Sequence, residues 1–268
     1  MKLQTIVDIK PSEWKIGYED KILMLGSCFS DEIGEQMQQR FLHVTCNPFG
    51  TLYNPLSIAQ ALQMNDTPEL IEHDGLWHSM AHHGSFSRAT REEAEQAVRA
   101  SMETMQSALA EATVVIVTFG TAWVYERNGE IVGNCHKLPE NQFHRRRLSV
   151  EEIVAAWKPI IDRYPDKHWL FTVSPIRHIK DGLHENQLSK ATLLQAVEQL
   201  GDYFPSYEIL LDELRDYRFY ADDLVHPSSL AVNYIWERFV DTFCTPQTKN
   251  ELVLQHKRWK HEHHIPLH

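Results

Sequence analysis

Apolar residues gather into short continuous runs that are separated by longer amphipathic segments. Five runs have the length and β-branched content of buried strands: residues 21–26, 113–120, 168–174, 207–211 and, shortest, 41–46. The segments with helical periodicity are residues 31–40, 56–64, 91–110, 150–164, 185–200 and 228–243. Strands that alternate with helices predict an α/β fold of three layers (α/β/α), with a five-stranded, mainly parallel sheet between the helices.

One segment interrupts this alternation. Residues 123–132 place apolar-rich arms around Asn128-Gly129, two residues that tolerate the positive φ angles of a type I′ turn. The segment directly follows the strand predicted at residues 113–120, and the carboxyl ends of parallel strands line the ligand crevice in such sheets. We therefore expect a small β-hairpin insertion at the rim of the site.

Length and composition indicate one domain. The chain has 268 residues, 43% of them hydrophobic, which is enough for one large core. No linker or internal repeat divides residues 1–268, and residues 249–268 are expected to be a loosely packed tail.

Charge and cysteine usage narrow the class of partner. The formal net charge of −11 disfavours nucleic acid and acidic membrane surfaces as partners. The basic run at residues 144–147 is interpreted as a solvated loop. Four dispersed cysteines predict reduced thiols. No apolar run reaches the ~18 residues of a membrane helix, and residues 1–17 lack a signal-peptide core, so a cytoplasmic protein is expected.

A hydroxyl, an imidazole and a carboxylate stand out as candidate chemistry. Ser27 follows Gly26 at the end of the first predicted strand, and Asp223 precedes His226 by three residues, just before a helix that begins near Pro227. A carboxylate at this spacing can fold back onto Nδ1 of the imidazole and hold the tautomer whose Nε2 accepts the serine proton. These are the parts of an activated serine nucleophile.

Structural alternatives exist for each part. Ser27 could be a helix N-cap, but Ser30 lies directly before two acidic residues and is expected to cap that helix instead. The Asp–His pair could be a surface pair with a capping role, and Asp222 competes for the carboxylate role. Cys28, beside the serine, is expected to point toward the packed side as an inert thiol.

The segment Gly26-Ser27-Cys28-Phe29-Ser30 resembles the signature of the GSCFA family, with Ser30 in place of a final alanine. Five further segments are similar to recurring segments of that family: residues 47–55, 118–125, 134–137, 174–178 and 220–228. Along the chain the serine comes first and the Asp/His pair comes last, and hydrolases of the GDSL or SGNH class have the same order. The resemblance implies an SGNH-like fold and a triad of Ser27, His226 and Asp223.

An SGNH-like site also implies donors for the oxyanion that forms when serine attacks an ester. These are usually the serine amide, a glycine amide after the second strand and an asparagine after the third. Ser27 and Gly50 match the first two, although Gly50 could equally be a plain turn glycine. Residues 119–123 contain no asparagine, which leaves Thr121 or a main-chain N–H as the substitute. Asn47 or Asn54 from the second loop is the alternative.

Candidate substrate-binding residues complete the site. They are Asn47, Asn54, Gly120, His136, Arg177 and His178. Arg177 has the alternative of a structural ion pair. The sixteen histidines show no metal-ligand spacing, so no metal and no cofactor are expected. A metal held by His136, His178 and Asp223 is the alternative.

The expected activity is hydrolysis of an O-acyl ester, with a small acyl group on a carbohydrate or other polyol, by analogy with the class. Acyl transfer to a sugar hydroxyl would use the same residues. The alternative from a different class is a non-catalytic binding protein that keeps the fold and the pocket, which the missing asparagine leaves open. The oligomeric state is not predicted.

Overall fold

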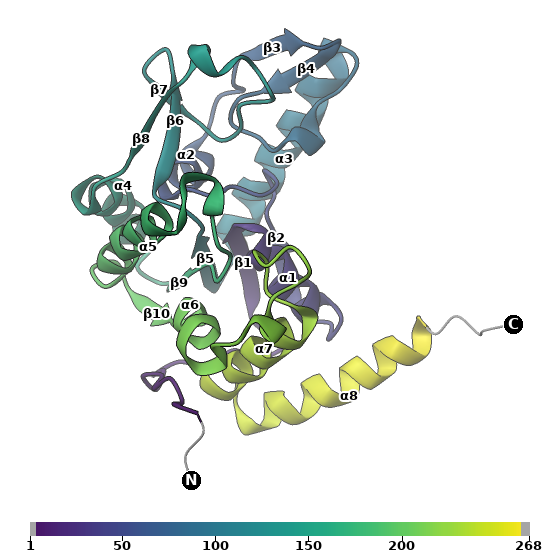
Figure 1. Ribbon diagram of the computed structural model, residues 1–268. Coiled ribbons are helices and arrows are strands. Elements are labelled where there is room, and N and C mark those ends of the chain that lie inside the picture. The colour runs from purple at the N-terminus through teal and green to yellow at the C-terminus, as the bar shows by residue number, and fades with distance from the viewer. Residues whose placement is uncertain (1–3, 264–268) are drawn as a thin grey trace, which may run out of the picture.

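The computed structural model describes residues 4–263 and shows a three-layer α/β/α arrangement (Figure 1). Its central sheet has five strands in the order β10-β9-β5-β1-β2, and all neighbouring strands are parallel. The strands are β1 (Lys21–Gly26), β2 (His43–Cys46), β5 (Val114–Phe119), β9 (His168–Val173) and β10 (Asp202–Phe204). The predicted fold class is confirmed.

Helices cover both faces of this sheet. They are α1 (Cys28–Gln38), α2 (Pro55–Gln63), α3 (Arg91–Glu111), α4 (Val150–Arg163), α5 (Leu183–Val197), α6 (Ser206–Glu208), α7 (Ser229–Phe243) and α8 (Pro246–Glu262). Along β5, Val115 and Val117 join the core under α2 to α5, whereas Val114 and Ile116 join the core under α1 and α7. Because both faces of the strand are buried, its sequence is a continuous apolar run.

One predicted strand is wrong. Residues 207–211 are helical, divided between α6 and the π-helical segment Ile209–Leu214. The fifth strand is β10, which lies at the sheet edge beside β9. Ile209 and Leu210 are buried in the core under α1 and α7. A five-residue apolar run has no periodicity that distinguishes a strand from one buried helical turn.

Residues 249–262 of the tail expected from the sequence belong to α8. Thr245 caps α8 by accepting a hydrogen bond from the Thr248 amide, and Pro246 occupies its first turn. Leu252 packs into the core under α1 and α7, and Figure 1 shows the rest of α8 extending away from the sheet. Residues 264–268 of the predicted tail lie outside the described residues.

The predicted hairpin insertion is present. β6 (Trp123–Arg127) pairs with β7 (Glu130–Val132), and Asn128 and Gly129 between them have φ angles of 54° and 84°. A third strand, β8 (His144–Arg147), pairs with the other edge of β6, so the basic run is a strand rather than a solvated loop.

Two smaller features complete the description. The connection between α2 and α3 contains a hairpin of β3 (Leu70–His73) and β4 (Leu76–Ser79). No helix in residues 4–263 has the length and apolar character that crossing a bilayer requires.

Candidate active site

Ser27 lies at the junction of β1 and α1. Gly26 adopts a φ of 134°, and a Cβ there would lie 2.1 Å from Thr118 O, so only glycine fits this turn. Ser27 occupies the N-cap position of α1, yet its side chain makes no capping hydrogen bond. Its Oγ is buried and has no hydrogen-bond partner within residues 4–263.

The prediction that Ser30 caps this helix is wrong, because α1 begins at Cys28. Ser30 lies inside the first turn, where its Oγ is 2.7 Å from Thr118 Oγ1 and 3.1 Å from Leu25 O. Ser30 therefore ties the helix to β1 and β5, and the Ser27 hydroxyl remains unused by the fold.

Asp223 and His226 form the expected pair in the loop before α7. Asp223 Oδ2 lies 2.6 Å from His226 Nδ1, and Oδ1 accepts hydrogen bonds from the amides of Val225 at 2.9 Å and His226 at 3.0 Å. These two amides and the imidazole lower the pKa of Asp223 to about 2. The carboxylate thus stays ionised and orients the imidazole so that Nε2 is free to act as a base.

A cavity of about 530 Å³ opens at the carboxyl ends of β5 and β9. Five predicted site residues line it: Asn54, Thr121, Arg177, His178 and His226. Trp123 and Tyr125 of β6 form part of the wall, so the hairpin insertion lies at the rim as predicted. The sheet topology brings residues as far apart in the sequence as Cys28 and His226 to one cavity.

Ser27 and the Asp223–His226 pair are not in contact in this structure. Ser27 is completely covered, and the absence of a partner for its Oγ means that His226 Nε2 does not reach the hydroxyl. His178 is a second imidazole near the serine. A Cβ placed on Gly120 would lie 3.4 Å from Ser27 Cβ and 3.5 Å from His178 Nε2, so both side chains lie next to Gly120.

His178 is a neutral, partner-free imidazole beside the serine. Its Nε2 is buried and has no hydrogen-bond partner within the described chain. Burial, with smaller contributions from Lys190 and His226, lowers the pKa of His178 to about 3. The imidazole is therefore uncharged at neutral pH. The sequence predicted that His178 binds substrate. Its position next to Gly120, which Ser27 also borders, places the imidazole near the serine as well.

The expected backbone donors are engaged elsewhere. The Gly50 amide donates to Asn47 O at 2.7 Å, and Gly50 has a φ of 73°, as a turn glycine does. The Thr121 amide donates to Tyr53 O at 3.0 Å, and the Ser27 amide donates to Thr118 O at 3.3 Å. The structure therefore offers no support for the oxyanion roles predicted for Gly50 and Thr121.

Both asparagines also hold the backbone. Asn47 Oδ1 accepts from the Gly26 amide at 2.8 Å, and its Nδ2 donates to Asp31 at 2.7 Å. Asn54 caps α2 through Ser57 and lines the cavity. His136 lies away from the cavity, with Nε2 2.8 Å from Ser79 O. Asn47 and His136 are thus not brought to the site.

Cys28 lies between the cavity and the core. It lines the cavity, and it also packs against the core under α1 and α7, the packed side expected from the sequence. Burial raises the pKa of the Cys28 thiol, while its own amide and that of Phe29 at the start of α1 counteract the rise. The thiol therefore remains protonated more readily than a free cysteine.

Lys190 of α5 is a site residue that sequence reasoning missed. Its side chain is fully buried, and Nζ donates hydrogen bonds of 2.7 Å to Gly120 O and to Ser174 O. Burial lowers the pKa of Lys190 to about 7. The lysine joins the ends of β5 and β9 directly behind Gly120. A lysine within a helical pattern normally indicates a solvated face, so the sequence carried no signal for it.

The proposed metal alternative finds no geometric support. Within residues 4–263, no three histidine, cysteine, aspartate or glutamate side chains form a group that would hold a metal ion. His136, His178 and Asp223 thus do not form a ligand set.

The chain matches a family model. The model described as the GSCFA family matches residues 21–239, which run from the start of β1 into α7 and include every site residue described above. No curated protein matches the chain.

Proposed function

Because the chain belongs to the GSCFA family, and because an oriented imidazole lines its cavity while a buried serine hydroxyl is left unused by the fold, we propose that it is a serine ester hydrolase of SGNH type. The observation that carries the proposal is the distance of 2.6 Å between Asp223 Oδ2 and Nδ1 of His226, which lines the cavity. A carboxylate in this position fixes the tautomer that a general base requires. The free hydroxyl of Ser27 at the end of β1 supplies the nucleophile.

In the proposed reaction, Ser27 Oγ attacks the acyl carbon while His226 Nε2 takes the serine proton. The resulting imidazolium, held by Asp223, then gives that proton to the leaving alcohol, and an acyl-serine remains. Water attacks this ester with His226 again as the base, so the acid is released and Ser27 regains its proton. The net reaction consumes one ester and one water and yields one acid and one alcohol.

The distance between Ser27 and His226 must shorten before this reaction. Catalytic hydrogen bonds are often long without substrate and tighten in the reacting complex. His226 belongs to a short loop in which the Ala221 amide donates to His226 O at 2.8 Å, and Leu224 has a positive φ of 56°. The imidazole is about half exposed, with 49% of its side chain accessible. The mechanism therefore requires a movement of this loop that brings Nε2 to the Ser27 hydroxyl.

His178 is the best-placed oxyanion donor in this mechanism. Its Nε2 lacks a protein partner and lies on the Ser27 side of the cavity, next to Gly120. A neutral imidazole whose Nε2 carries the proton can donate to the oxyanion without bringing a charge. This role would replace the asparagine of the SGNH pattern, and the first amides of α1 at Cys28 and Phe29 would be further donors.

The test is hydrolysis of 4-nitrophenyl acetate and of acetylated monosaccharides by the wild type and by Ser27→Ala. We expect the wild type to release acetate and Ser27→Ala to be inactive at an unchanged unfolding temperature. Cys28→Ser is the matched control, since it changes the neighbouring cavity nucleophile. Activity that survives in Ser27→Ala and disappears in Cys28→Ser would assign the reaction to the thiol.

A further inference from the structure

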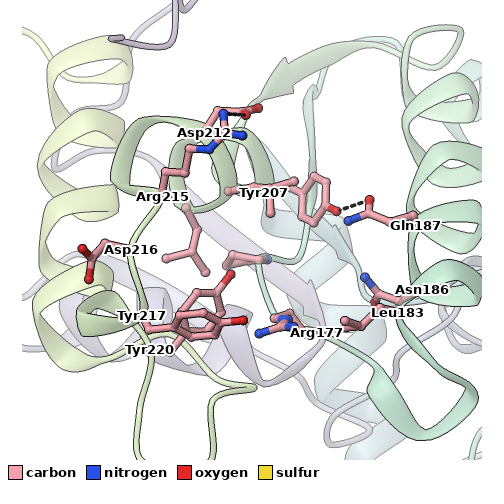
Figure 2. A pocket seen from close by; sticks show the side chains of 13 residues that line it. Arg177, Leu183, Asn186, Gln187, Tyr207, Asp212, Arg215, Asp216, Tyr217 and Tyr220 are labelled. Carbon is pink, nitrogen blue, oxygen red and sulfur yellow. Dashed lines mark hydrogen bonds and ion pairs between the residues drawn. The ribbon is translucent and has the colours of Figure 1, made fainter. Parts of the chain in front are cut away.

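A second cavity of about 410 Å³ lies beside the candidate active site. Figure 2 shows its side chains, which come from the connection after β9, from α5 and from the segment between α6 and α7. Arg177 belongs to the walls of both cavities. A ligand that passes Arg177 would therefore reach from one cavity into the other.

The Arg177 guanidinium is stacked but not paired. Its Cζ lies 5.4 Å from the Tyr220 ring centroid and 5.8 Å from that of Tyr217, as Figure 2 illustrates. One hydrogen bond runs from Nη1 to Leu224 O at 3.1 Å. Within residues 4–263, Arg177 makes no ion pair with a carboxylate. The structural ion pair that the sequence left open as its alternative role is therefore absent from this part of the chain. Stacking uses the face of a guanidinium. The N–H groups that remain free in its plane can therefore donate to a planar oxyanion.

The other charges near this cavity have partners. Arg215 lies 3.8 Å from Asp212, and Arg218 lies 3.1 Å from Asp216. The charged side chains that line the cavity are those of Arg177, Asp212, Arg215 and Asp216. Of these four, only Arg177 has no ion-pair partner within residues 4–263. The local charges therefore favour a ligand with one negative charge, bound at Arg177.

The remaining walls suit a ring that carries hydroxyl groups. Tyr217 is 63% exposed, and its ring and that of Tyr220 are 5.9 Å apart, which provides an aromatic surface. Across from them, Gln187 Oε1 accepts a hydrogen bond of 2.7 Å from Tyr207, so its amide group is held in place. Such cavities, apolar with a few fixed polar groups, bind small organic ligands.

We propose that the natural ester is carried by an acidic polyol: the carboxylate binds Arg177, the ring that bears it packs against Tyr217 and Tyr220, and the ester enters the neighbouring cavity. A planar carboxylate matches the guanidinium fork and carries a single charge. The inference rests on the proposed function for the ester, whereas the anion site stands on the contacts of Arg177.

The experiment compares acetyl esters of glucuronic acid and of glucuronamide, which differ only in the charge. For the wild type, kcat/KM for the acid should exceed that for the amide by about tenfold to a hundredfold, the range of a charge-assisted hydrogen bond. In Arg177→Gln the ratio should fall to near one. If Arg177→Gln also disturbs the His226 loop, kcat/KM falls by the same factor for both esters, and their ratio does not change.

Arg99→Gln is the control for the loss of one positive charge, because Arg99 is an exposed residue of α3 outside both cavity walls. It should keep the wild-type ratio. Tyr217→Ala, at an exposed position, should raise KM for the acid with little change in kcat. The proposal is overturned if the wild-type ratio is near one, or if Arg177→Gln keeps it.

A separate measurement distinguishes this inference from the proposed function. Glucuronate and glucuronamide are titrated into the wild type and Arg177→Gln, and binding is followed by nuclear magnetic resonance. Failure of the wild type to hydrolyse either ester would refute the esterase. Glucuronate binding that is lost in Arg177→Gln would still support the anion site, whereas equal binding of acid and amide would refute it.

Discussion

Replacing Asp223 by asparagine is the sharpest test of the proposed triad. Asparagine keeps the size of the side chain, and its Oδ1 can still accept from the Val225 and His226 amides, so the loop should hold its shape. The changed atom is the one that faces His226 Nδ1 at 2.6 Å. There an amide NH₂ donates rather than accepts, which places the imidazole proton on Nε2, where a base needs a lone pair.

The size of the effect follows from the exposure of the pair. The corresponding change in a buried Ser-His-Asp triad costs about 10⁴ in kcat. Here the Asp223 side chain is 50% exposed, so water can compete as the partner of Nδ1 and restore part of the active tautomer. General-base catalysis as a whole contributes about 10²–10⁴. We therefore expect kcat to fall by about 10²–10³, which is less than for a buried carboxylate.

The assay is the pH profile of kcat for acetate release by the wild type, Asp223→Asn and Asp222→Asn. Asp222 is the adjacent exposed aspartate, so its variant controls for the loss of charge in the loop. Asp222→Asn should stay within a few-fold of the wild type. A larger loss in Asp222→Asn would show that the wrong carboxylate has been assigned, and no loss in either would remove His226 from the role of base.

Three further outcomes are expected. Ser27→Ala should abolish hydrolysis while shifting the unfolding temperature little, because Ser27 Oγ makes no hydrogen bond; a large loss of stability would indicate a structural role. His178→Phe should lower kcat by about 10²–10³, as loss of one oxyanion donor does, whereas His178→Gln should retain more activity; equal loss in both variants would contradict a donor role. Lys190 has a pKa lowered from 10.5 to about 7, so between these values the unfolded chain binds more protons there and stability rises with pH. The unfolding free energy of the wild type relative to Lys190→Met, from urea titrations, should thus increase between pH 7 and 9, and a flat or falling difference would show that the lysine stays charged.

The fold was predictable because it depends on local patterns. The strands β1, β5 and β9 are apolar runs buried on both faces, and the Asn128-Gly129 turn specifies the hairpin. The failure at residues 207–211 has a physical cause, because this run is too short for its periodicity to distinguish a strand from a helical turn.

The candidate site was predictable only where one short segment contains the whole interaction. Asp223 and His226 are three residues apart, and their contact follows from that spacing. The N-cap of α1 was misplaced because Ser27 and Ser30 both have the residue type that caps helices, and the choice depends on where the chain leaves β1. The roles of backbone amides could not be predicted either, because the sequence does not identify the turn carbonyl to which the Gly50 amide donates.

Lys190 shows most clearly why the electrostatics of the site escaped prediction. The lysine is 70 positions from Gly120, and only the packing of α5 against the strand ends brings its ammonium group to that carbonyl. The main cause of the low pKa of His178 is its own burial, and the adjacent Lys190 lowers that pKa further. With a pKa of about 7, the lysine is largely uncharged above neutral pH, so its part in the site is to join β5 to β9 rather than to stabilise charge. In the proposed mechanism, a neutral His178 can donate to the oxyanion without competing with His226 as a base. It would thereby take the place of the asparagine that residues 119–123 lack.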